Sequence, residues 1–168
     1  MDKQMLEGKV AIITGASYGM GQTIAEVFAE EGAAVVLTAR GKEKLDAVVD
    51  DLRRKGYRAL GLAADTSSTK DTVRVFEETV KTFGDVDILV NNAGIGEQTI
   101  IDETTDEWMQ YIMNVNLGGP MRYIREALKY FLPKNDGVII NISSVNGARP
   151  FCGATYTSTK GALNTLTK

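Results

Sequence analysis

Tyr156 and Lys160, four residues apart, are the pair of side chains in this sequence best suited to acid–base chemistry. If their segment is helical, both lie on one face, because positions i and i+4 are neighbours on a helix surface. A phenol titrates near about pH 10, and a neighbouring ammonium favours the phenolate and lowers that pKa toward a range useful for proton transfer. Such a pair is also common on protein surfaces, so the spacing alone does not establish a site.

The sequence contains no histidine and one cysteine, Cys152. These counts exclude Ser-His-Asp and Cys-His catalysis, histidine metal sites, an intrachain disulfide and a Cys-x-x-Cys redox pair. Acid–base work must therefore fall to Tyr, Lys, Asp, Glu or an activated Ser. Cys152 is interpreted as a bystander, because its neighbours supply no base to activate a thiolate.

The composition favours one globular domain over residues 1–168. Apolar residues make up 43% of the chain, and 19 Lys and Arg stand against 22 Asp and Glu, a net charge of −3. This balance argues against a nucleic-acid groove or a polybasic membrane surface. The sequence shows neither a signal peptide nor a membrane span, and a single thiol favours a cytoplasmic location.

Short apolar runs alternate with longer segments of helical periodicity. We expect strands over residues 9–14, 34–38, 58–64, 87–91 and 137–142. We expect helices over residues 22–31, 42–55, 69–83 and 106–132, the last bent near residues 118–120, and another helix from about residue 155. This alternation predicts an α/β fold, a doubly wound parallel sheet in a three-layer α/β/α Rossmann arrangement.

A glycine-rich loop, residues 14–21 (TGASYGMG), joins the first expected strand to a helix. Glycines allow a tight turn and a close approach to a pyrophosphate, and the helix N-terminus offers free N–H groups and partial positive charge. An ordinary glycine-rich turn is the alternative. The position after the first strand favours dinucleotide binding, whereas the absence of a following Gly-Lys-Ser/Thr excludes a P-loop.

The end of the second expected strand distinguishes NADP from NAD. In an NAD site, an acidic residue there binds the ribose 2′-hydroxyl. Here Arg40 occupies the tip, and Lys42 follows closely. A guanidinium can pair with a 2′-phosphate and Lys42 can add charge, which favours NADP(H); NAD(H) remains possible, with Arg40 then a solvated strand end.

Four motifs in this order resemble the short-chain dehydrogenase/reductase family, and the likeness covers essentially the whole chain. They are residues 14–21, the Asn-Asn-Ala-Gly run at 91–94, Asn116 within Asn-Val-Asn-Leu, and Ser143-Ser144 followed by Tyr-Thr-Ser-Thr-Lys at 156–160. Bacterial 3-oxoacyl-[acyl-carrier-protein] reductases are among the members that the sequence resembles. The resemblance implies an oxidoreductase that transfers a hydride between a nicotinamide and a small-molecule carbonyl or alcohol.

The resemblance also implies roles for the matched residues. Tyr156 would be the general acid–base, Lys160 its activator, Ser144 the hydroxyl that orients the carbonyl, and Asn116 the fourth catalytic member. Asp65 would hold the adenine amino group. The cofactor-binding residues would be Gly15, Ser17, Tyr18, Gly19, Met20, Gly21, Arg40, Asp65, Thr66, Asn92, Ala93 and Gly94, together with Tyr156 and Lys160.

Several of these residues also have plainer interpretations. Ser143 and Ser144 could be turn residues at a strand end, and Asn116 could satisfy backbone groups freed at a helix bend. Asn91 is expected to tie two strands together. Tyr18 stands where many NADP-dependent relatives carry Lys or Arg, which leaves Arg40 as the main reason to expect NADP.

The resembled family normally continues beyond the position of Lys168 through two more strands and a substrate-covering segment. The resemblance therefore implies a sheet that lacks its last strands. It also implies a homo-oligomer, dimer or tetramer, formed in part by the helix around residues 117–132. Two functions remain open at this point: an NADP(H)-dependent oxidoreductase, and a dinucleotide-binding module without useful turnover.

Overall fold

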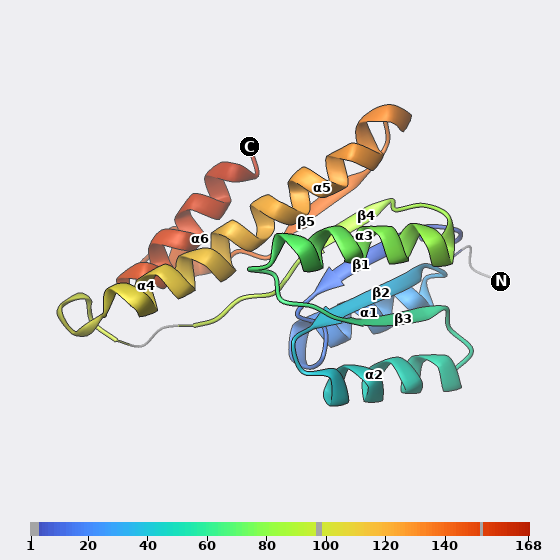
Figure 1. Ribbon diagram of the computed structural model, residues 1–168, viewed down its shortest axis with the longest axis horizontal. Coiled ribbons are helices and arrows are strands. Elements are labelled where there is room, and N and C mark those ends of the chain that lie inside the picture. Colours follow the sequence, from blue (N-terminus) through green and yellow to red (C-terminus); the bar gives the residue numbers. More distant parts are fainter. Residues whose placement is uncertain (1–3, 97–98, 152) are drawn as a thin grey trace.

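The computed structural model describes residues 4–96, 99–151 and 153–168. Within these ranges, five parallel strands form one sheet in the order β3-β2-β1-β4-β5 (Figure 1). The strands are β1 (Val10–Thr14), β2 (Ala34–Ala39), β3 (Ala59–Ala63), β4 (Ile88–Asn91) and β5 (Val138–Asn141). The chain order reverses between β1 and β4, and the loops that follow these strands open at one end of the sheet.

Helices cover both faces of this sheet, as the strand–helix alternation predicts (Figure 1). They are α1 (Gly19–Glu30), α2 (Lys42–Arg54), α3 (Thr69–Phe83), α4 (Asp106–Met113), α5 (Gly119–Lys134) and α6 (Ala154–Leu166). Helices α1 and α2 pack on one face, and α3 and α5 pack on the other. Neighbouring side chains of β1 show the division, since Ile13 belongs to the first core and Ile12 to the second. The predicted fold class is confirmed.

The long helix expected over residues 106–132 is divided by a π-helical segment, Asn114–Gly118, which lies between α4 and α5. Glycines at 118 and 119 and Pro120 in the first turn of α5 explain why the regular helix stops and restarts here. The wider π turn buries Val115 and Asn116. The regular α-helix is interrupted close to the position where the sequence predicts a bend, in the residues that precede the proline.

Asn91 joins two strands at the end of the sheet where the site forms. Its Nδ2 donates to Oδ1 of Asn141 at 2.9 Å, from the last residue of β4 to the last residue of β5. The interpretation of Asn91 as a tie between strands is confirmed. Within the described part of the chain, no helix is long and apolar enough to cross a membrane.

Candidate active site

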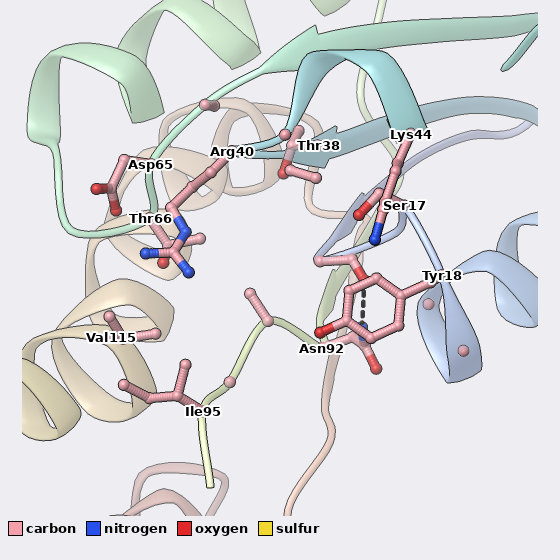
Figure 2. A pocket seen from close by; sticks show the side chains of 18 of the residues that line it. Ser17, Tyr18, Thr38, Arg40, Lys44, Asp65, Thr66, Asn92, Ile95 and Val115 are labelled. Atoms are coloured by element: carbon pink, nitrogen blue, oxygen red, sulfur yellow. Dashed lines mark hydrogen bonds between the residues drawn. The ribbon is translucent and has the colours of Figure 1, made fainter. Parts of the chain in front are cut away.

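A cavity of about 500 Å³ lies at the carboxyl ends of the strands (Figure 2). It brings together every expected cofactor-binding residue outside α6, from the glycine loop, Arg40, the Asp65–Thr66 pair and the Asn92–Gly94 run. The lining also includes residues that the sequence analysis did not single out: Thr38, Ala39, Gly41, Lys44, Ala64, Ile95 and Val115. Most of them are sequence neighbours of predicted site residues, and this closeness in the chain is the only feature of the sequence that indicates them.

The glycine loop needs its glycines because backbone approaches backbone there. Gly15 has φ 66°, and a Cβ on it would lie 2.8 Å from Cα of Ala93. A Cβ on Gly21 would lie 2.4 Å from the carbonyl oxygen of Gly15. The first turn of α1 therefore packs directly onto the loop, and the loop packs onto the segment after β4.

Thr14 and Asn92 brace this close approach. The Thr14 hydroxyl accepts hydrogen bonds from the backbone N–H groups of Asn92 and Ala93, both at 3.0 Å. The Asn92 amide donates to the carbonyls of Thr14 at 2.9 Å and Gly15 at 3.1 Å. Because these bonds provide partners for backbone groups on both sides of the close approach, they stabilise the turn that shapes the cavity.

The N-terminus of α1 opens onto the cavity and suits an anion. Tyr18 occupies the N-cap position, where the described contacts give its side chain no hydrogen bond to the helix, and the first turn carries no acidic residue. In α3, by contrast, the Ser68 hydroxyl caps the helix by accepting from N–H of Asp71 at 3.2 Å. Uncapped N–H groups and the helix dipole fit the pyrophosphate of a dinucleotide.

Asp65 stands at the cavity wall and is held by its neighbours. Its Oδ1 accepts hydrogen bonds from both the backbone N–H and the hydroxyl of Ser67, each at 2.8 Å. Its own N–H donates to Oδ2 of Asp71 at 3.0 Å, and this bond, followed by the contact with Arg74, lowers the pKa of Asp71. A charged Asp71 at the start of α3 therefore anchors the backbone of the segment that presents Asp65.

The cationic side of the cavity differs in part from the expectation. Arg40 lines the cavity and donates to the hydroxyl of Tyr111 on α4. Lys42, expected to add charge there, instead pairs with Asp46 one helical turn on, and its side chain is 73% exposed. Since α2 begins at Lys42, the helical register turns this residue outward and brings Lys44 to the cavity (Figure 2). The placement of Lys42 is therefore corrected.

Lys160 is buried, with 5% of its surface exposed, and lies beside the end of the cavity. Its Nζ donates to the carbonyl of Ile142 at 2.8 Å and lies 5.8 Å from the ring centroid of Tyr156. A Cβ on the cavity residue Gly94 would lie 3.7 Å from this Nζ. Burial lowers the pKa of Lys160. The structure thus brings an ammonium, a phenol and the cavity wall together.

Asn116 connects α6, the helix that carries Tyr156 and Lys160, to the segment after β4. It is 1% exposed, its Nδ2 donates to the carbonyl of Ile95, and its Oδ1 accepts from N–H of Ile95, both at 2.8 Å. Nδ2 also lies 3.4 Å from the hydroxyl oxygen of Thr159 on α6. Asn116 lies in the π-helical segment, but its amide pairs with Ile95 and not with carbonyls freed in its own helix, so the interpretation that it satisfies freed helix groups is wrong.

The two neighbouring serines have different environments. The Ser143 hydroxyl donates to the carbonyl of Lys160 at 3.1 Å and so holds α6. The Ser144 oxygen accepts from the backbone N–H and the side-chain amide of Asn146, at 3.1 and 3.3 Å. Within the described contacts, the Ser144 hydroxyl hydrogen is not used, which leaves it able to donate to a ligand.

Gly147 is a site residue that sequence reasoning missed. A Cβ there would lie 2.8 Å from the backbone carbon and oxygen of Lys160. The turn that carries Ser144 therefore sits directly against the helix that carries Lys160. Its only signal in the sequence is a glycine shortly after the serine pair. Cys152, interpreted as a bystander, lies outside the described residues, and those residues hold no cluster of His, Cys, Asp and Glu able to bind a metal ion.

A family model described as short chain dehydrogenase matches residues 9–168. An uncharacterized oxidoreductase of Methylorubrum extorquens is 42% identical over 163 residues, 96% of this chain and 65% of that protein. A 3-oxoacyl-[acyl-carrier-protein] reductase of Staphylococcus aureus is 37% identical over 162 residues, 95% of this chain and 66% of that protein. The chain thus spans just under two thirds of the length of these relatives.

The fold has a close counterpart among solved structures. The crystal structure of a short chain dehydrogenase from Mycobacterium smegmatis matches with a TM-score of 0.93 and 36% identity. The match covers 98% of this chain and 69% of that one.

Proposed function

Because the chain belongs to the short-chain dehydrogenase family, we propose that it is an NADP(H)-dependent oxidoreductase that interconverts a carbonyl compound and a secondary alcohol. The observation that carries this proposal is the position of the buried Lys160 ammonium. It lies 5.8 Å from the Tyr156 ring and beside Gly94, a wall of the cavity that suits a dinucleotide. A phenol, an ammonium and a nucleotide cavity are what carbonyl reduction requires.

The glycine loop, the N-terminus of α1 and Asp65 would hold the dinucleotide, with the pyrophosphate at the helix and the adenine at Asp65. When bound, the nicotinamide supplies or accepts the hydride. The chain's own part is to bind this group and to present the substrate oxygen to Tyr156. The Lys160 ammonium lies next to Gly94 in the cavity wall, since a Cβ on Gly94 would be 3.7 Å from Nζ, an ordinary contact distance.

Tyr156 Oη would give a proton to the carbonyl oxygen in reduction and take it back in oxidation. The Lys160 ammonium lies 5.8 Å from the ring of this phenol, and the Ser144 hydroxyl donates a hydrogen bond to the same substrate oxygen as charge develops there. Asn116 acts through Ile95, whose backbone it fixes at the edge of the cavity. We therefore regard Tyr156, Lys160 and Ser144 as catalytic and Asn116 as a positioning residue.

Arg40 supports NADP(H) over NAD(H). It lines the cavity after β2, where an NAD site carries a carboxylate, and the neighbouring positions hold Ala39 and Gly41. The Tyr111 hydroxyl on α4 accepts a hydrogen bond from Arg40 and so restrains its guanidinium. A planar guanidinium can form a forked pair with a 2′-phosphate.

An apolar stripe supports the expected homo-oligomer. Met113, Met121, Leu128 and Leu132 are exposed at spacings that place the α5 members on one helix face. We propose that a second copy of the chain covers this stripe. In size-exclusion chromatography with light scattering, Leu128→Asp should lower the mass if the stripe is an interface; an unchanged mass would contradict this proposal.

The function is tested by mixing the purified chain with NADPH and a panel of ketones and 3-oxoacyl thioesters, and following NADPH absorbance. We expect carbonyl-dependent oxidation of NADPH, faster than with NADH. A dinucleotide-binding module would instead bind NADPH, seen as a change in its fluorescence, and show no turnover at high protein concentration. That result would contradict the oxidoreductase proposal.

A further inference from the structure

Lys44 is a cation of the cavity to which the proposed reaction assigns no role. It lies in the first turns of α2, and its side chain extends toward the Ser17–Tyr18 part of the glycine loop (Figure 2). Among the residues that the structure describes, no carboxylate forms an ion pair with it. The same helix pairs its other early lysine, Lys42, with Asp46 at 2.5 Å. Lys44 is therefore an uncompensated positive charge in the wall of an anion-binding cavity.

The surroundings of Lys44 suit a phosphate more than any other group. Arg40 lines the same cavity four residues earlier in the chain, and Ser17 lies on the same side of the cavity as Lys44 (Figure 2). The start of α2 adds the positive end of a helix, with Gly41 at the N-cap, where it has no side chain to occupy the free N–H groups. Two cations and a hydroxyl in the lining of one cavity are donors that a phosphate dianion can use.

Tyr18 of the glycine loop does not supply a positive charge for a phosphate at this place. Its side chain is uncharged and 71% exposed at the mouth of the cavity, so the glycine loop contributes no cation of its own. The Lys44 side chain reaches toward that loop from α2 instead. A cation on α2 can attract a phosphate as a cation on the glycine loop would, because Coulomb attraction depends on the separation of the charges and not on the element that carries them.

We propose that Lys44, together with Arg40, forms the subsite for the 2′-phosphate and so determines the preference for NADP(H) over NAD(H). This inference rests on the proposed dinucleotide site. NADPH and NADH differ only in the 2′-phosphate, so Lys44 should strengthen the binding of NADPH and have little effect on the binding of NADH. The lysine is exposed to solvent in the free protein, so added salt screens the effect.

The test measures the dissociation constants of NADPH and NADH by cofactor fluorescence for the chain and for three variants: Lys44→Gln, Lys44→Arg and Lys42→Gln. Binding is the readout, so no substrate is needed. Lys44→Gln should weaken NADPH binding roughly five- to tenfold and leave NADH within twofold. Lys44→Arg should keep the preference. Lys42→Gln is the matched control on the same helix and should change neither constant.

Equal weakening of both cofactors by Lys44→Gln, or no change in either, would overturn the assignment of Lys44 while leaving the dinucleotide site intact. A loss of preference in Lys42→Gln equal to that in Lys44→Gln would overturn it too, because general surface charge would then explain the effect. If the unmodified chain bound neither cofactor, the proposed function would fail first, and the two failures are therefore distinguishable.

Discussion

The side-chain amide of Asn116 pairs with both backbone groups of Ile95, the oxygen accepting and the nitrogen donating at 2.8 Å each. The pair joins the π-helical segment between α4 and α5 to the segment after β4. Ile95 and its neighbour Gly94 line the cavity, and Gly94 faces the Lys160 ammonium. A buried amide thus sets where the cavity meets the proposed catalytic residues, which explains the use of a π turn at this point.

Replacing Asn116 with Ala should lower both stability and turnover. Two partly buried backbone groups of Ile95 would lose their partners, which costs about 1–2 kcal/mol of the free energy of unfolding. The displaced Gly94 segment should lower kcat more than it raises KM. Asn114→Ala is the matched control, since Asn114 lies in the same π-helical segment but is exposed and contacts Arg122. Comparable losses in both variants, measured by urea unfolding and kinetics, would refute the special role of Asn116.

The two serines allow a cleaner separation of catalysis from structure. Ser144→Ala should lower kcat about a hundredfold, because it removes a donor to the substrate oxygen, and should lower stability by about 1 kcal/mol, because the Asn146 amides lose their acceptor. Ser143→Ala should lower stability by a similar amount, because it removes the hydrogen bond to the Lys160 carbonyl, and should change kcat much less. The measurements are steady-state kinetics and denaturant unfolding on both variants. The reverse pattern would assign the substrate contact to Ser143.

Reversing the charge at the end of β2 tests cofactor choice. Arg40→Asp should weaken NADPH binding at least about tenfold more than NADH binding, because a carboxylate repels the 2′-phosphate and can accept from a 2′-hydroxyl. Fluorescence titration with each cofactor gives both constants. Equal changes for the two cofactors would mean that Arg40 does not contact the 2′-phosphate.

These relationships differ in how far the sequence could predict them. The sheet, its helices and the cavity residues follow from local patterns, because periodicity and glycine spacing act over a few residues. The start of α2 at Lys42 agrees with the sequence expectation, but the exchange of Lys42 for Lys44 could not be predicted, because it depends on which face of the helix the cavity meets in the folded protein. The Asn116–Ile95 pair joins positions far apart in the chain, and the contact between Gly147 and Lys160 is a tertiary one. No local pattern reports such contacts.

Burial of Lys160 makes the stability of the protein depend on pH. Its pKa is lowered in the folded protein, so at pH values between that lowered pKa and the unfolded value of about 10.4 the unfolded chain binds more protons. The contribution of Lys160 to the free energy of unfolding therefore rises with pH through this window. We expect the stability of the Lys160→Met variant, relative to the wild type, to fall as pH is raised from neutrality.

Urea unfolding of both proteins at several pH values measures this difference, and alkaline effects common to the two proteins cancel. A difference in the free energy of unfolding that stays constant with pH would contradict a buried ammonium at this position.

The most direct test concerns the hydroxyl of Tyr156. Tyr156→Phe removes the proton donor and keeps the ring that lies 5.8 Å from the Lys160 ammonium. The measurement is the pair of kcat for carbonyl reduction and Kd for NADPH, on wild type and variant. The account predicts that kcat falls by at least about a hundredfold while Kd stays within twofold. Turnover that persists in Tyr156→Phe with cofactor binding intact would contradict it.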